Sequence, residues 1–347
     1  MSSIETIIGL LQGAREQKAS DLHISVGSPP SYRIDGALKS AADNKVTAEE
    51  AEGYAAALVT EAQRLQLEER GEVDFSYSLP DCRFRMNIYR QQGYVSIAAR
   101  LIAQSIPTLE QLQMPAVIAP LADKAQGLIL VTGPTGSGKS STLAAFIHHI
   151  NRSQKKHIIT LEDPIEYVHR SEASIIDQRE VGQDTRSFSN GLRAALRQDP
   201  DVILVGEMRD LETISAAITA AETGHLVLGT LHTTDAPQTI DRIIDAFPGP
   251  QQAQVRAQLA AVLLTVISQR LLPRSSGQGR IAATEILMNT PAAANLIRSE
   301  KVHQIRSLMQ TGKALGMHTL DMSIKELLQK GIVTPAAAKP YLTEGGL

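Results

Sequence analysis

The sequence has little of what disulfide, zinc and base-stacking chemistry require. It contains one cysteine, Cys82, and no tryptophan, and only 3% of its residues are aromatic. One cysteine excludes an internal disulfide and a multi-cysteine zinc site, and it fits a reducing cytoplasm. Few aromatic side chains disfavour a surface on which bases stack. The formal net charge of −3 and the lack of a long basic run argue against a general nucleic-acid binder.

The sequence also lacks any apolar run long enough to cross a bilayer, so we expect a membrane role to be peripheral. The N-terminal stretch MSSIETIIGLLQ has helical apolar spacing, and Ser2 stands three residues before Glu5. This pattern is a helix capping box and not a secretion signal. A length of 347 residues fits two domains, at least one of which buries a large core.

The first hundred residues mix helices with antiparallel strands. In the stretch CRFRMNIY apolar and polar residues alternate, which places Arg83 and Arg85 on one face of a strand. An irregular link, QSIPTLEQLQMP, follows. We predict a first domain over 1–102, a linker over 103–115 and a second domain over 116–347, with a helical part from about 290 to 347.

The second domain alternates helices with apolar strands. The predicted strands are LILVT (128–132), HIITL (157–161), VILV (202–205) and HLVLGTL (225–231). Strands separated by helices favour an α/β fold with a mostly parallel sheet that is covered on both faces.

The stretch GPTGSGKS, residues 133–140, follows the first of these strands and precedes a helix. Glycines permit a tight loop whose amides face phosphate oxygens, while Lys139 adds a positive charge for the β and γ phosphates and the Ser140 hydroxyl can bind Mg²⁺. A flexible glycine-serine connection would not require lysine and serine at the helix start. The predicted nucleotide-binding residues are Gly133, Pro134, Thr135, Gly136, Ser137, Gly138, Lys139, Ser140 and Ser141.

The acidic residues of the site are divided unusually. The stretch VILVGEMRD has glycine, Gly206, where many nucleotide-hydrolysing folds carry an aspartate, so only Glu207 remains. The stretch TLEDPIE supplies Glu162, Asp163 and Glu166 after the strand over 157–161, at the edge where ligands of parallel sheets collect. We expect this cluster to direct Mg²⁺, directly or through water, while Glu207 orients or deprotonates the attacking water.

With this division, glycine at 206 indicates close backbone approach. Two alternatives stay open at this edge. Glu207 could instead be an exposed carboxylate that leads into the next helix. His232 follows another apolar strand, where it would contact the γ-phosphate or report its loss to the next helix. A single histidine is more often structural.

Charge on a transferred phosphoryl group is commonly stabilised by arginine, often from a neighbouring subunit. The candidates are Arg83, Arg85, Arg193, Arg197 and Arg209. We hypothesise an oligomeric ring in which the first domain of one subunit closes the nucleotide site of another.

Several segments together resemble the type IV pilus retraction ATPases, the PilT-like family within the secretion ATPases of RecA-like fold. The segments that carry the resemblance are ASDLHISVGSPPSYRIDG (19–36), FRMNIY (84–89), GPTGSGKSS (133–141), TLEDPIEYVH (160–169), LRQDPDVILVGEMRDLETI (196–214), TAAETGHLVLGTLHTTDAPQTIDRIID (219–245) and GMHTLDMSIKELL (316–328). They span nearly the entire chain. TLEDPIE with GEMRD and GTLHT is much more specific than the phosphate loop alone.

The resemblance implies a homohexamer of PAS-like N-terminal and RecA-like C-terminal domains that uses ATP and Mg²⁺ to depolymerise a pilus. It also implies a location at the inner face of the cytoplasmic membrane, where a platform protein is the partner. The family's acidic box falls on residues 162–166, with Glu166 as its functional glutamate, its atypical Walker B glutamate on Glu207 and its histidine box on His232. Its arginines that reach across subunits map to the FRMN segment and to Arg197.

One segment departs from the family pattern. The retraction family has AIRNLIRE in its terminal helices, whereas residues 292–299 read AAANLIRS. We expect this departure to leave ATP hydrolysis unaffected. It bears on how hydrolysis is coupled to retraction, or on whether the chain is the main retraction motor or an accessory PilU-like paralogue. A nucleic-acid translocase on the same fold and a nucleotide-gated interaction protein are the other function classes.

Overall fold

The structure is a computed structural model that describes residues 2–34, 36–80, 82–102 and 105–342. It divides into two compact units, Met1–Gln104 and Ser105–Leu347. The expected linker over 103–115 begins with two residues outside the described part, and the expected C-terminal helical part also ends outside it.

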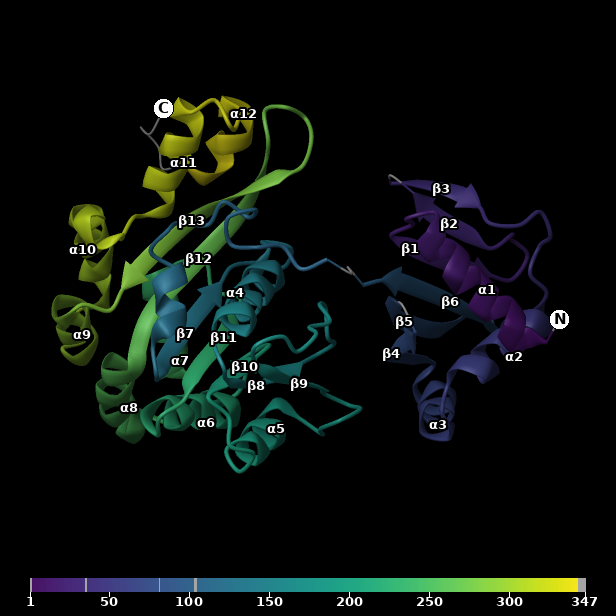
Figure 1. Cartoon of the computed structure of the whole chain (residues 1–347), viewed down its shortest axis with the longest axis horizontal. Helices are drawn as coiled ribbons and strands as arrows, with labels where there is room; N and C mark the ends of the chain where they lie inside the picture. Colours follow the sequence, from purple (N-terminus) through teal and green to yellow (C-terminus); the bar gives the residue numbers. More distant parts are fainter. Residues whose placement is uncertain (1, 35, 81, 103–104, 343–347) are drawn as a thin grey trace. The chain divides into compact units, whose positions relative to one another are not determined.

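Unit 1 is an antiparallel sheet covered by helices (Figure 1). Its strand order is β3-β2-β1-β6-β5-β4. The elements are α1 (Ser3–Glu16), β1 (Asp21–Ser25), β2 (Ser31–Ile34), β3 (Ala37–Ser40), α2 (Ala48–Leu58), α3 (Glu61–Arg70), β4 (Glu72–Leu79), β5 (Cys82–Gln91) and β6 (Tyr94–Leu101). The capping box at Ser2 starts α1, as the sequence predicts. Along β5 every second residue from Cys82 to Ile88 is buried, so Arg83 and Arg85 share the outer face.

Unit 2 contains a seven-stranded sheet with the order β13-β12-β7-β11-β10-β8-β9. The sheet elements are β7 (Gly127–Thr132), β8 (His157–Glu162), β9 (Ile175–Glu180), β10 (Val202–Val205), β11 (Leu226–Leu231), β12 (Leu263–Pro273) and β13 (Arg280–Met288). Only the β12–β13 pair is antiparallel among these strands. The predicted parallel sheet is confirmed, whereas β9, β12 and β13 were not predicted.

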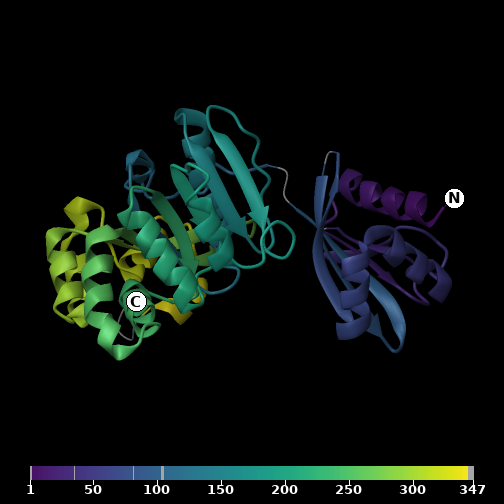
Figure 2. The same cartoon turned by 90° about the horizontal axis from the view of Figure 1, so that it is seen from below.

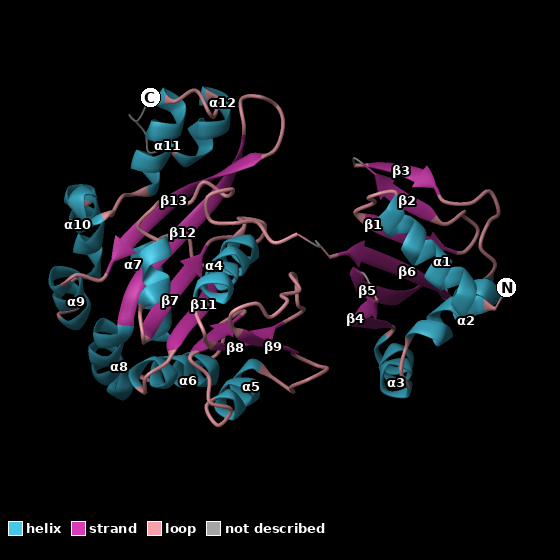
Figure 3. Ribbon diagram, in the orientation of Figure 1, coloured by secondary structure: helices cyan, strands magenta, loops and turns pink. Residues whose placement is uncertain are grey.

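Helices cover both faces of this sheet, as Figures 2 and 3 show. They are α4 (Lys139–Ser153), α5 (Phe188–Ala195), α6 (Leu211–Glu222), α7 (Ala236–Asp245), α8 (Gly249–Val262), α9 (Pro291–Arg298), α10 (Ile305–Thr311), α11 (Leu320–Gln329) and α12 (Pro335–Ala338). On β7, Leu128 and Leu130 join the core under α6 to α8, whereas Ile129 and Val131 join the core under α4. Two-sided burial explains why the central strands are continuously apolar.

The parallel strands all point to one edge of the sheet. The phosphate loop follows β7, the acidic segment follows β8, Glu207 follows β10 and His232 follows β11. Because β11 pairs with both β7 and β10, and β10 pairs with β8, the four segments emerge side by side. This edge is where open parallel sheets bind ligands.

Candidate nucleotide site

The loop over residues 133–138 joins β7 directly to α4, whose first residue is Lys139. Gly133 has a φ of +143°, and a Cβ there would lie 2.5 Å from the carbonyl oxygen of Gln269. Glycine is therefore required by the backbone and by the close approach of β12. Pro134, Thr135 and Gly136 are exposed at the turn of the loop. The loop leads to a helix N-terminus, which favours phosphate groups.

Lys139 bends back over this loop. Its Nζ donates to the carbonyl oxygens of Gly133 at 2.8 Å and Pro134 at 3.1 Å. Burial lowers the pKa of Lys139, while the carboxylates of Glu207 and Glu166 act in the opposite direction. The ammonium group is thus close enough to two carboxylates from two other strand ends to interact with both, and its two carbonyl partners would compete with a phosphate.

Gln269 is a part of the site that was not predicted from the sequence. This β12 residue is 1% exposed, and its Nε2 donates to the backbone oxygen of Ser137 at 2.7 Å. Among the described residues, its Oε1 and the buried Ser137 hydroxyl have no hydrogen-bond partner. The only local signal is a polar pair, Gln269 and Arg270, inside the apolar strand LLTVISQRLLP. Tyr167 was also missed, and its hydroxyl lies 2.7 Å from Ser141 Oγ on α4.

The three carboxylates after β8 have different surroundings. Glu162 accepts from Thr160 Oγ1 at 2.7 Å and from Gln178 Nε2 at 3.0 Å, and burial raises its pKa. Asp163 and Glu166 are exposed. Glu166 is the member of this segment whose charge acts on Lys139. The charge of Glu166 therefore acts on the lysine of the phosphate loop, while Glu162 is held by side chains of the sheet edge.

Magnesium would find oxygen ligands at this place. Ser140 lies in the first turn of α4, one residue after Lys139, and Glu166 is an exposed carboxylate whose charge raises the pKa of that lysine. A hydroxyl and a carboxylate, completed by phosphate oxygens and water, suit Mg²⁺. Within the described ranges, no three His, Cys, Asp or Glu side chains form a metal-binding group on their own.

Glu207 is held inside the site. Its side chain is 18% exposed, its Oε1 lies 3.0 Å from His232 Nε2, and the same oxygen accepts from Arg209 Nε. The helix that follows is instead capped by Asp210, which accepts from Thr213 N at 2.8 Å. The alternative of an exposed helix-leading carboxylate does not describe Glu207. A hollow of about 520 Å³, lined by Glu207, Met208, Arg209, Leu231, His232, Thr233 and Arg242, opens beside it.

The close backbone approach expected at Gly206 is confirmed. Its N–H donates to the Leu161 carbonyl at 2.8 Å, and a Cβ would stand 3.0 Å from that oxygen and 3.3 Å from Glu162 Cα. A larger residue would push the ends of β10 and β8 apart. The aspartate that is missing from this position has no room here.

The candidate arginines are dispersed. Arg197 is exposed after α5, Arg193 pairs with Glu212 at 3.1 Å, and Arg209 contacts Glu207. Arg83 and Arg85 belong to unit 1, where Arg83 donates to Ser78 Oγ at 3.3 Å and Arg85 is exposed.

Comparison with known proteins is consistent with this geometry. A model of the type II/IV secretion system protein family matches residues 2–335. The chain is 48% identical over 334 residues to the type IV pilus retraction ATPase PilT of Pseudomonas aeruginosa, covering 96% of this chain and 97% of that protein. It is 40% identical over 326 residues to the type IV pilus ATPase PilU of the same organism, covering 94% and 85%.

A solved structure gives the same result for the fold. The crystal structure of the pilus retraction motor PilT with bound ADP has a TM-score of 0.91 and 46% identity, covering 99% of this chain and 98% of that one. The expected fold class, a PAS-like α+β domain followed by a RecA-like domain, is confirmed. The sequence, the fold and these relatives together show that the chain belongs to the type II/IV secretion system protein family.

Proposed function

We propose that this protein is an ATP-hydrolysing motor that powers retraction of type IV pili. The observation that carries the proposal is that the phosphate loop with Lys139, the segment with Glu166 and Glu207 follow neighbouring strands at one sheet edge, in a chain that matches PilT over nearly its whole length. The PilT structure with ADP supports nucleotide binding at this edge.

The residues divide the chemistry as follows. The amides of residues 133–141 and the Lys139 ammonium bind the phosphates. Ser140 with Glu166, and Asp163 through water, would hold Mg²⁺, which when bound would supply charge neutralisation on the β and γ phosphates. Glu207 accepts a proton from the attacking water or orients it, and His232 fixes the carboxylate and contacts the γ-phosphate. Glu162 shapes the acidic segment by its bonds inside the sheet.

Assembly completes the site. Hydrolysis needs positive charge on the transferred phosphoryl group, and the exposed Arg197, with Arg83 and Arg85 from unit 1 of a neighbouring subunit, would supply it in a homohexamer. Retraction requires a platform protein at the inner face of the cytoplasmic membrane, and a paralogous retraction ATPase would share the work. Attachment at that face would be peripheral. No described helix has the length and apolarity of a membrane span.

Substitution of the two central residues tests the enzyme. Glu207→Gln keeps the size of the side chain but removes its basicity, so we expect Mg²⁺-dependent turnover to fall at least a hundredfold while ADP still binds. Lys139→Ala should weaken nucleotide binding as well. The matched control is Glu222→Gln, an exposed carboxylate at the C-terminal end of α6. Absence of Mg²⁺-dependent turnover in the parent protein would refute the enzyme and favour a nucleotide-gated interaction protein.

The second candidate is an accessory PilU-like role. It is favoured by α9, where residues 292–299 read AAANLIRS and only Ala293, Ala294 and Ile297 are buried. Deletion of the gene separates the two roles: loss of a main retraction motor leaves excess surface pili and no twitching. Unchanged piliation with altered twitching would indicate the accessory role. A filter-binding assay at physiological salt tests the translocase class, since non-specific DNA affinity should be detectable there.

A further inference from the structure

Glu285 is a buried carboxylate that the mechanism above does not use. It lies on β13, is 6% exposed, and burial raises its pKa. Its Oε1 accepts from Ala236 N at 2.9 Å, and its Oε2 accepts from Leu320 N at 3.4 Å. These are the first residues of α7 and α11, so one carboxylate binds the N-termini of two helices.

Both contacts are electrostatically favourable. The first N–H groups of a helix have no partner inside the helix, and a helix N-terminus attracts negative charge. Asp235 and Thr319 cap later N–H groups of the same two helices. Glu285 therefore satisfies donors that the ordinary caps leave free, and no other described residue is hydrogen-bonded to the first residue of both helices.

The α7 end of this link is close in sequence to the nucleotide site. His232, which pairs with Glu207, stands four residues before Ala236. Between them, Thr233 Oγ1 lies 2.7 Å from Thr239 Oγ1 on α7, so the loop is tied to the first turn of the helix. The loop that carries His232 is thus hydrogen-bonded to the helix whose first residue Glu285 holds.

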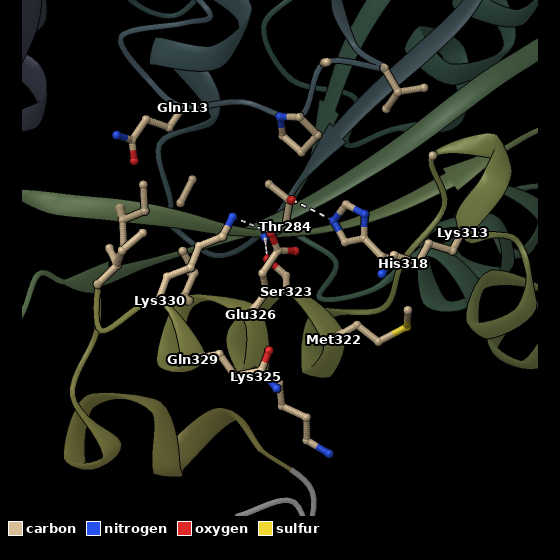
Figure 4. A pocket seen from close by; sticks show the side chains of 18 of the residues that line it. Gln113, Thr284, Lys313, His318, Met322, Ser323, Lys325, Glu326, Gln329 and Lys330 are labelled. Carbon is tan, nitrogen blue, oxygen red and sulfur yellow. Dashed lines mark hydrogen bonds and ion pairs between the residues drawn. The ribbon is translucent and has the colours of Figure 1, made fainter.

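The α11 end rests on β13. His318 exchanges backbone hydrogen bonds with Ile286 at 2.9 and 3.2 Å, its Nε2 lies 2.9 Å from Thr284 Oγ1, and Thr284 N donates to Ser323 Oγ at 3.1 Å. Figure 4 shows Thr284, His318 and Ser323 together, with α11 bordering a pocket of about 810 Å³. The pocket borders one side of α11, and on another side Ile324 packs the helix against Ile281 and Ala283 of β13.

We propose that Glu285 is a positioning residue that couples the His232 loop to helix α11, so that a change at the nucleotide moves the C-terminal helix. This inference rests on the proposed function for its nucleotide. The structural basis of the coupling is that the Glu285 carboxylate accepts hydrogen bonds from Ala236 N of α7 and Leu320 N of α11.

Glu285→Gln tests the coupling with little change of shape. A glutamine oxygen can accept from one helix, but its NH₂ group then faces the N–H of the other. Glu222→Gln is the control, since this exposed carboxylate on α6 accepts from Gln258 and lies outside the link. Hydrogen exchange of residues 232–240 and 318–326 is measured with and without ADP, and ADP binding is measured by calorimetry.

In the parent protein we expect ADP to change exchange in both segments, and in Glu285→Gln only in residues 232–240. In turnover, we expect Glu285→Gln to lower kcat about tenfold with an unchanged ADP dissociation constant. It should add no further loss to His232→Ala. The proposal would be overturned if the kcat losses of Glu285→Gln and His232→Ala added in the double variant. It would also be overturned if ADP still changed hydrogen exchange of residues 318–326 in Glu285→Gln.

The nucleotide-free protein separates this inference from the proposed function. Without ADP, Glu285→Gln should raise exchange at the start of the one helix that then faces the NH₂ group, and Glu285→Leu, which offers no acceptor to either N–H, should raise exchange at the starts of both α7 and α11. If the parent binds no ADP but both starts respond in Glu285→Leu, the function fails and the link stands. A response at one helix alone in Glu285→Leu overturns the link.

Discussion

The prediction that follows most directly from the site geometry concerns Gly206. In Gly206→Ala the new methyl group would lie 3.0 Å from the Leu161 carbonyl oxygen and 3.3 Å from Glu162 Cα, which are both backbone atoms. Backbone cannot rotate away as a flexible side chain does, so the ends of β10 and β8 must separate by a few tenths of an ångström. Overpacking of this kind costs about 1–3 kcal/mol.

The cost should appear in stability and more strongly in turnover. For a domain of this size 1 kcal/mol shifts Tm by roughly 2–4 °C, so we expect Gly206→Ala to lower Tm by about 2–12 °C. Glu207 follows directly, and displacement of a reacting group by about 1 Å can cost a hundredfold in rate. Gly206→Asp, which restores the missing aspartate, adds a carboxylate on the same Cβ and should be worse than alanine.

Gly249→Ala is the matched control, because a Cβ at that position meets no atom within 4 Å. It should leave Tm and kcat within the error of the parent, or raise Tm slightly. The assays are differential scanning calorimetry and steady-state ATP hydrolysis. Full stability and full turnover in Gly206→Ala would refute the explanation of the missing aspartate.

Two further predictions concern buried polar groups around the site. The pKa of His169 is lowered to about 4 by burial, so the unfolded chain takes up a proton near pH 6.5 and the folded chain does not. The free energy of unfolding is therefore unaffected by His169 well above pH 6.5, and it falls as pH drops toward 4, by about 2 kcal/mol between pH 6.5 and 5. Chemical denaturation should show no such loss for His169→Phe, while the exposed control His303→Gln should keep it. Gln269→Leu leaves the buried Ser137 carbonyl without its hydrogen-bond donor. We expect this variant to bind ADP about tenfold more weakly in calorimetry. Unchanged affinity would show that Gln269 does not hold the phosphate loop.

The sequence predicted the parts of the site that depend on local pattern. The phosphate loop, the four central strands and the crowding at Gly206 follow from glycine spacing and from apolar runs a few residues long. Because the predicted strands are parallel, their carboxyl ends meet at one edge of the sheet, and this alone is enough to bring Glu207 and Glu166 together.

The remaining parts depend on contacts between distant residues. Gln269 bonds Ser137 across 132 positions, and Glu285 bonds Ala236 across 49. A single polar residue inside an apolar strand is compatible with many partners, and periodicity does not choose among them. The division of the acidic segment, with Glu162 held in the sheet and Glu166 at Lys139, likewise depends on Gln178 and Thr160 in three dimensions.

The most direct test of the account is a crystal structure with Mg²⁺ and a non-hydrolysable ATP analogue. We predict that Lys139 leaves the Gly133 and Pro134 carbonyls to bind the β and γ phosphates, that Ser140 binds the metal ion, and that Glu207 faces the γ-phosphate beside His232. An empty loop over residues 133–140, or Glu207 directed into bulk solvent in every subunit, would contradict the account.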